Sequence, residues 1–87
     1  MYSPEFDEKW PHYFDELENE TKTRTAKKIK KVLEQPKKRH MKTGAAFFVA
    51  ETGQHRIVYR VFEQEGKVRF YFVGDHKQYE KWYKQFF

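Results

Sequence analysis

The sequence predicts an α+β fold: an N-terminal hairpin of two helices packed on a small antiparallel sheet of three main strands, closed by a C-terminal helix. Two observations favour it. Apolar residues recur at helical spacing through the first half of the chain, and near Gly44 the pattern changes to the period-two alternation of strands. With 87 residues, we expect one domain over residues 1–87.

The first helix is predicted over residues 4–19. Ser3 can cap it and Pro4 suits its first turn, while Pro11 predicts a kink or a restart near Trp10. The chain before this helix contains only Met1 and Tyr2, too little for a preceding strand.

A second helix is predicted from Thr21 to Gln35 and ends before Pro36. Its apolar stripe is expected to pack on the sheet: Ala26, Ile29, Val32 and Leu33. Positive charge is concentrated from Lys22 to Lys42, whereas the first twenty residues are acidic. This distribution favours a polyanion or an acidic protein as partner.

The first strand is predicted from Gly44 to Glu51, with Thr52-Gly53 as a two-residue turn. This turn places Val49 opposite Arg56 and Phe47 opposite Val58.

The other two strands flank a predicted turn at Glu65-Gly66. If Gln64 pairs with Lys67, then Tyr59 faces Phe72 and Arg56 faces Asp75. One sheet face then collects the core residues Ile57, Tyr59, Val61, Phe70 and Phe72, and the other collects Arg56, Val58, Arg60, Tyr71 and Val73. A one-residue slip would exchange the two faces.

The last helix is predicted from His76 to Gln85, with an aromatic stripe formed by Tyr79, Trp82, Tyr83 and Phe86. The register brings Arg56 and His76 together where the sheet ends and this helix begins.

The composition excludes several kinds of chemistry. There is no cysteine, and Ser3 is the only serine, so nucleophilic catalysis by these side chains is not expected. The four histidines lack metal-ligand spacing and no glycine-rich phosphate loop is present, so we expect neither a metal nor a small-molecule cofactor. No apolar run is long enough to span a membrane, and no signal peptide is seen. These observations predict a cytoplasmic protein that does not enter the membrane.

Arginine, lysine, histidine and tyrosine around one sheet face suit metal-free RNA cleavage, in which the RNA 2′-hydroxyl attacks the adjacent phosphate. An arginine can stabilise charge on the phosphoryl oxygens, and a histidine can transfer protons near neutral pH.

Two segments carry a resemblance to a known family: His55 to Val61, HRIVYRV, and Val73 to Tyr79, VGDHKQY. They resemble the central strand and the closing segment of the RelE/ParE superfamily of small bacterial and archaeal toxins. The resemblance implies a single RelE-like domain, the toxin of a type II toxin–antitoxin system, which cleaves mRNA on the ribosome and is held inactive by an antitoxin protein. Family members begin with a strand, which we expect to be absent or vestigial here.

The resemblance also implies site residues. Arg56 matches an arginine implicated in transition-state stabilisation, and His76 matches a closing basic or imidazole residue that transfers a proton. Tyr79, Trp82 or Tyr83 matches a late aromatic residue that supplies a hydroxyl or a stacking surface. RNA contacts are expected from the basic segment and the central strand: Lys37, Lys38, Arg39, His40, Lys42 and Arg60.

One departure leaves the activity open. RelE-type toxins often carry lysines at the positions matching Phe47 and Val49, so the proton acceptor here must be His76, His55 or His40, or catalysis is lost. Two alternatives therefore stand beside the endonuclease: a non-catalytic binding domain with the same fold, and a ParE-like inhibitor of DNA gyrase. His76 favours the endonuclease over the gyrase inhibitor.

Overall fold

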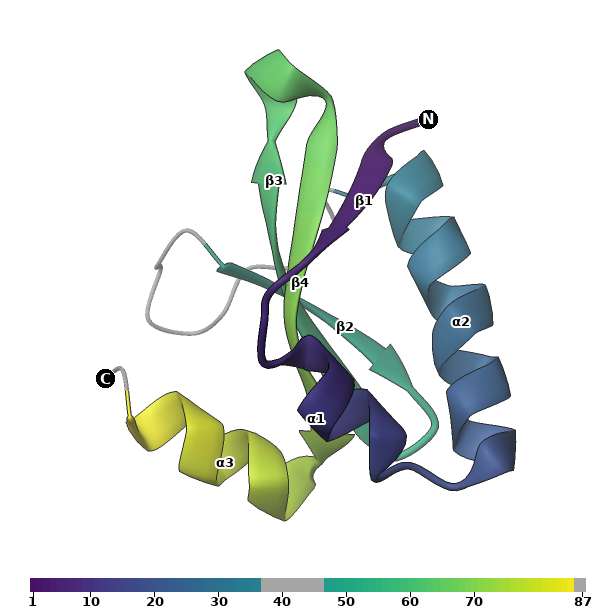
Figure 1. Cartoon of the computed structure of the whole chain (residues 1–87), viewed down its shortest axis with the longest axis vertical. Helices are drawn as coiled ribbons and strands as arrows, with labels where there is room; N and C mark the ends of the chain where they lie inside the picture. The colour runs from purple at the N-terminus through teal and green to yellow at the C-terminus, as the bar shows by residue number, and fades with distance from the viewer. Residues whose placement is uncertain (37–46, 86–87) are drawn as a thin grey trace.

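The computed structural model describes residues 1–36 and 47–85. Within them a four-stranded mixed sheet has the order β1-β4-β3-β2, and α2 and α3 lie on opposite sides of it (Figure 1). The elements follow in the order β1 (Ser3–Phe6), α1 (Trp10–Asp15), α2 (Asn19–Glu34), β2 (Phe47–Thr52), β3 (His55–Phe62), β4 (Lys67–Asp75) and α3 (His76–Lys84), with a 3₁₀ turn at Glu63–Glu65. The α+β class is confirmed, but the expected antiparallel sheet of three strands is wrong.

The missing strand is β1, which occupies residues predicted to begin a helix. It pairs in parallel with β4, and the Ser3 N–H donates to the Gly66 carbonyl at 2.8 Å. Pro4 is tolerated because β1 is an edge strand and needs hydrogen bonds on one side only. Pairing with a distant strand therefore overrides the local capping signal, and the expectation of an absent strand is wrong.

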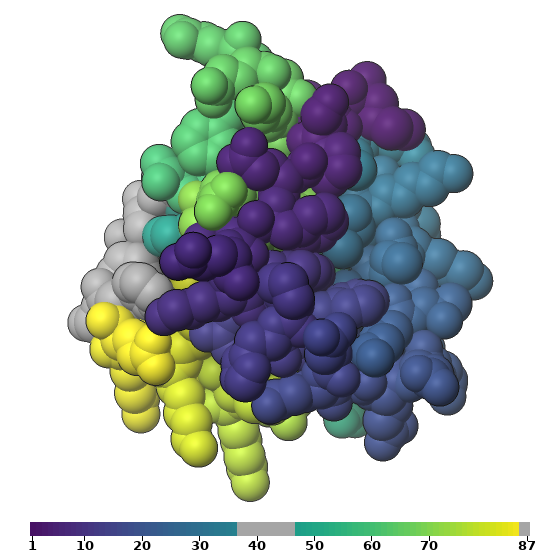
Figure 2. Space-filling model, in the orientation of Figure 1, coloured from purple at the N-terminus to yellow at the C-terminus, as the bar shows by residue number. Residues whose placement is uncertain are grey.

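Of the two helices that follow β1, α1 is much shorter than the helix predicted over residues 4–19, whereas α2 is close to its prediction. α1 begins at Trp10 with Pro11 in its first turn, where a restart was expected. α2 ends at Glu34, one residue before its predicted end at Gln35. The inward stripe of α2 differs at one position, since Ala26 is exposed and Thr25 is fully buried. Figure 2 shows β1, α1 and α2 forming a continuous surface on the viewed side of the molecule. No helix in residues 1–36 and 47–85 is long and apolar enough to cross a membrane.

The β2–β3 turn lies one residue later than predicted. Thr52 pairs with His55, so Val49 lies opposite Val58 instead of Arg56, and Glu51 lies opposite Arg56. The pairing has moved by two residues along β3, so the side chains keep their predicted faces. Phe48 accordingly stacks on Tyr59 in the main core, with ring centroids 5.7 Å apart.

The β3–β4 pairing differs from the predicted one in two ways. The turn is longer, because Phe62 and not Gln64 pairs with Lys67, and the paired strands contain an unexpected bulge. Tyr59 pairs with Phe70 but Val58 pairs with Phe72, so Tyr71 is an extra residue on β4. An extra residue reverses the alternation of side chains beyond it. The predicted faces are therefore correct up to Phe70 and wrong for Phe72 and Val73.

The buried side chains form two clusters, one on each face of the sheet, and the bulge places Phe72 in one and Val73 in the other. The cluster beneath α1 and α2 includes Trp10, Val32, Leu33, Ala50, Ile57, Tyr59, Val68, Phe70 and Val73. The cluster beneath α3 includes Val49, Val58, Phe72, Tyr79 and Trp82. The second cluster fixes α3, because Trp82 stacks on Phe72 at 5.6 Å.

Tyr59 ties the end of α2 to the sheet. It is fully buried, and its hydroxyl donates a hydrogen bond to the Pro36 carbonyl at 2.6 Å. Burial raises the pKa of Tyr59 to about 12, because an apolar environment disfavours the charged phenolate.

The Tyr59→Phe variant is expected to be about 1–3 kcal/mol less stable than the wild type at pH 7, because the buried Pro36 carbonyl loses its donor. The unfolded tyrosine ionises near pH 10, so Tyr59 contributes its full stability below about pH 10 and loses it as the pH rises towards about 12. The advantage of the wild type should therefore fall by about 3 kcal/mol over that window, so that it vanishes or is reversed at the high end; urea unfolding measures it. A difference that stays constant with pH would contradict this role.

Candidate functional site

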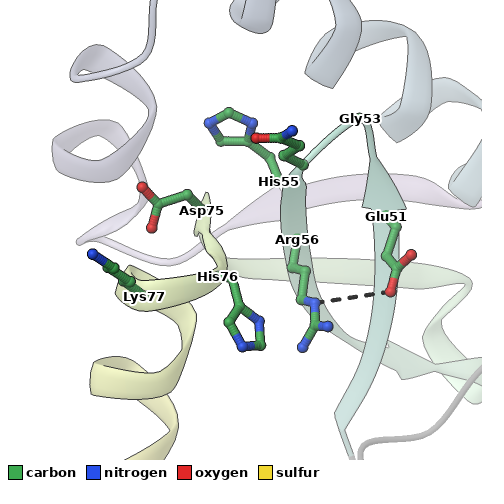
Figure 3. A pocket seen from close by; sticks show the side chains of 8 residues that line it. Glu51, Gly53, His55, Arg56, Asp75, His76 and Lys77 are labelled. Atoms are coloured by element: carbon green, nitrogen blue, oxygen red, sulfur yellow. Dashed lines mark ion pairs between the residues drawn. The ribbon is translucent and has the colours of Figure 1, made fainter.

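An open hollow of about 510 Å³ lies where β3 begins and β4 passes into α3. Its lining residues come from the β2–β3 turn and from the start of α3: Glu51, Gly53, Gln54, His55, Arg56, Asp75, His76 and Lys77. Figure 3 shows that the side chains of Arg56 and His76 point to the same side, whereas His55 points to the other. The predicted meeting of Arg56 and His76 is therefore present.

Arg56 is held in place from two directions. Its guanidinium carbon lies 4.9 Å from the centre of the Tyr79 ring, and its Nε lies 3.8 Å from Glu51 Oε1. The side chain is 28% exposed. Stacking on an aromatic ring fixes the plane of a guanidinium while leaving its edge available for hydrogen bonds. Arg56 is thus oriented and still reachable by an anion.

His76 is the first residue of α3 and is open to solvent, with 62% of its side chain exposed. Its Nε2 lies 3.0 Å from Glu80 Oε1, one turn along the helix. Because the group is exposed, this pair contributes little to stability. An exposed imidazole beside an oriented guanidinium can transfer a proton to or from a phosphate ester bound between them.

The predicted pairing of Arg56 with Asp75 is wrong. The longer β3–β4 turn moves the pairing by two residues and the bulge moves it back by one, so Gly74 lies opposite Arg56 and His55 lies opposite Asp75. Asp75 instead caps α3: its carboxylate accepts a hydrogen bond from the Gln78 N–H at 2.9 Å, and the Gln78 side chain accepts one from the Asp75 N–H. Gly74 must lack a side chain, since a Cβ there would lie 2.6 Å from the Phe72 ring.

The positions where RelE-type toxins often carry lysines are packed beneath α3. Val49 is buried, and the Phe47 ring contacts Tyr71 and Trp82 edge-on at 5.3 and 5.7 Å. These side chains support α3 and do not supply a proton acceptor.

The two candidate tyrosines differ in accessibility. Tyr79 is buried with its ring against Arg56, so it orients the guanidinium. Tyr83 is half-buried and contacts the Tyr79 ring at 6.0 Å.

Arg60 lies on the same sheet face as Arg56 but not in the hollow. Its guanidinium stacks on Phe47 and Phe62 at 5.7 and 5.1 Å. The facing arginine, Arg69, is bound by two carboxylates of the β1 segment, Glu5 at 2.8 Å and Asp7 at 3.1 Å. These two bonds raise the pKa of Arg69, with the Glu5 bond the larger cause. Arg69 therefore anchors the edge strand, whereas Arg60 has no carboxylate within ion-pair distance in the described part of the chain.

The remaining predicted RNA contacts, Lys37, Lys38, Arg39, His40 and Lys42, lie outside the described residues. Among residues 1–36 and 47–85, no three metal-ligating side chains are clustered.

The arrangement of the sheet and helices is similar to that of several solved toxins. The isolated E. coli RelE toxin matches with a TM-score of 0.78 and 21% identity, over 100% of each chain. The chain has the RelE toxin fold. The intact E. coli RelBE toxin–antitoxin complex matches with a TM-score of 0.78 and 23% identity, over 86% of this chain and 96% of that one. The RelBE2 complex of Mycobacterium tuberculosis matches with a TM-score of 0.76 and 18% identity, over 86% and 98%.

The sequence matches no protein-family model and no curated protein. The predicted likeness to RelE is confirmed at the level of the RelE fold, including the initial strand that the sequence analysis expected to be lost. Glu51 lines the hollow beside Arg56, but the sequence patterns did not identify it as a site residue. Its position opposite Arg56 depends on the exact turn between β2 and β3, which has no signal in composition.

Replacing Asp75 tests whether it caps α3 or pairs with Arg56. Asp75→Ala is expected to destabilise the protein by about 0.5–2 kcal/mol, because the first turn of α3 loses its cap. Asp75→Asn should cost clearly less, because asparagine caps helices about as well as aspartate. Thermal and urea unfolding of both variants measure this difference. Equal destabilisation by the two substitutions would mean that the charge matters and that the cap does not.

Proposed function

We propose that this protein is the toxin of a type II toxin–antitoxin pair and cleaves mRNA on the ribosome without a metal ion. The observation that carries the proposal is the convergence of Arg56 and His76 in one open hollow of a RelE fold. Arginine binds phosphate oxygens with its planar fork, and histidine changes its protonation state near neutral pH. Both groups are needed when a ribose 2′-hydroxyl attacks the neighbouring phosphate.

Each side chain has one task in this reaction. Arg56 stabilises the negative charge that develops on the phosphoryl oxygens as the 2′-oxygen bonds to phosphorus. His76 moves a proton at one of the two reacting oxygens. Tyr79 holds the guanidinium in its plane, and Tyr83 offers a half-exposed ring on which a base can stack.

The partner is an antitoxin with an acidic or amphipathic segment. Similar solved structures include complexes of a RelE toxin with its antitoxin. In this chain α2 presents exposed cations to such a segment, among them Lys27, Lys30 and Lys31. Opposite charge favours rapid association and correct orientation.

A non-catalytic binding domain is the second candidate. It is favoured by the packing of Phe47 and Val49 beneath α3, which removes the lysines that RelE-type toxins often use. The two candidates differ in one measurable respect, since only the endonuclease produces new mRNA ends inside codons.

Inducible expression of the protein without an antitoxin should arrest growth and produce mRNA 5′ ends at fixed codon positions. Arg56→Ala and His76→Ala should each lower the cleavage rate by about 10²–10⁴-fold, because each removes a group that acts in the transition state. His12→Ala is the matched control: His12 is an exposed histidine of α1 that also pairs with a glutamate one turn away. It should cleave like the wild type.

Circular dichroism and the melting temperature of the variants exclude unfolding as the cause. If wild-type protein gives no new 5′ ends, the non-catalytic domain is the better description. If it arrests growth through DNA gyrase without cutting mRNA, the ParE-like function is the better one. Full activity of both site variants would place the chemistry elsewhere.

The basic segment is proposed to bind RNA phosphates. Neutralising Lys37, Lys38, Arg39 and Lys42 together should weaken ribosome binding and flatten its dependence on salt. Each lost phosphate contact changes the slope of log K against log salt concentration by about 0.7–0.9. Binding measured between low and physiological salt tests this, and an unchanged slope would show that these side chains make no phosphate contact.

A further inference from the structure

The proposed reaction needs two proton transfers, and His76 can serve only one of them in a single step. One group must take the proton from the 2′-hydroxyl, and another must give a proton to the departing 5′-oxygen. Of the two other predicted acceptors, His40 lies outside the described residues, and the His55 side chain points to the other side of the strand from Arg56 (Figure 3). Within residues 1–36 and 47–85, the candidates for the second group are therefore the other side chains of the hollow.

We propose that Glu51 is the catalytic proton acceptor, and that His76 is the proton donor on the other side of Arg56. This inference rests on the proposed endonuclease function and assigns the acid and the base within it. The geometric basis is that Glu51 of β2 lies directly opposite Arg56 of β3, with its Oε1 3.8 Å from Nε.

Figure 3 shows Arg56 flanked by Glu51 on one side and His76 on the other. An in-line displacement at phosphorus has its attacking and leaving oxygens on opposite sides of the phosphoryl group. A phosphate held by Arg56 between these side chains would present its 2′-oxygen to one and its 5′-oxygen to the other. A carboxylate is ordinarily ionised at neutral pH and is ready to accept a proton.

The step balances without a further reactant. The bond from the 2′-oxygen to phosphorus forms as the 2′ proton moves to the Glu51 carboxylate. The bond from phosphorus to the 5′-oxygen breaks as protonated His76 gives its proton to that oxygen. The products are a 2′,3′-cyclic phosphate and a 5′-hydroxyl, and exchange with water restores both side chains.

Glu51 also explains how the site can work with apolar residues at Phe47 and Val49. Its carboxylate supplies the base, while Arg56 supplies positive charge for the phosphate. A purely structural role for the Glu51–Arg56 pair is a poor alternative, since the Glu51 side chain is 46% exposed and pairs at such exposure contribute about 0–1 kcal/mol.

Other charged groups lie around Glu51 and His76. Those that line the hollow or face its two active groups are His55, Arg56, Asp75, Lys77 and Glu80, and Lys28 and Lys31 of α2 line a neighbouring hollow with Glu51. The test therefore compares variants with one another and does not rely on an absolute pH value.

The test uses the full-length protein and ribosomes carrying an mRNA with one cleaved codon, under single-turnover conditions. Glu51→Gln should reduce cleavage by about 10²–10⁴-fold, and Glu51→Asp should restore part of it. Glu65→Gln, in the exposed β3–β4 turn, is the control and should leave the rate unchanged. The wild-type rate should rise and then fall with pH. Glu51→Gln should lose the rise and His76→Ala the fall.

A second substrate separates the acid from the base. When sulfur replaces the 5′-oxygen at the cleaved bond, the departing thiolate needs no proton. This mRNA should restore cleavage by His76→Ala and should not restore cleavage by Glu51→Gln.

The results distinguish failure of this inference from failure of the proposed function. If the wild type does not cleave the mRNA, the proposed function is wrong. If the wild type cleaves and Glu51→Gln is equally active, or keeps the rise of rate with pH, or is restored by the sulfur substrate, Glu51 is not the proton acceptor.

Discussion

The bulge at Tyr71 is the constraint on which the rest of this structure depends. It turns Phe72 away from the main core, and Phe72 then forms the floor on which Trp82 of α3 stacks. It also moves the pairing by one residue, which places Gly74 opposite Arg56, next to the Asp75 that caps α3. With regular alternation, the second apolar cluster would lose the Phe72 ring on which Trp82 stacks.

The site follows from this second cluster. Tyr79 is part of it and at the same time carries the guanidinium of Arg56 on its ring. The residues that fix α3 therefore also orient the arginine, and His76 is placed because it begins the same helix. Rigid support beneath a reactive group keeps it in its working geometry, which is a large part of catalytic power. The site is thus built on the packing of one short helix.

Period-two and helical patterns in the sequence were sufficient for the class of the fold and for α2 and α3. They also brought Arg56 and His76 together, although through a pairing of Arg56 with Asp75 that is wrong. They failed for β1, because a four-residue edge strand is stabilised by pairing with β4 and has no local signature that outweighs Ser3-Pro4. They also failed for the pairing details. The length of the β3–β4 turn, the bulge and the position of the β2–β3 turn leave no trace in composition. Together they place Gly74 opposite Arg56 on β4 and Glu51 opposite it on β2. Long-range pairing is what the sequence could not specify.

The central claim is that this site cleaves RNA by using the RNA's own 2′-hydroxyl, with an arginine between a proton acceptor and a proton donor. A single substitution in the substrate tests it most directly. An mRNA with 2′-deoxyribose at the nucleotide before the cleaved bond is bound to ribosomes, and its cleavage by the wild-type protein is compared with that of the all-ribose mRNA. The account predicts cleavage of the all-ribose mRNA, leaving a cyclic phosphate, and no cleavage at the deoxy position. Cleavage of the deoxy substrate at the same bond and rate would contradict it.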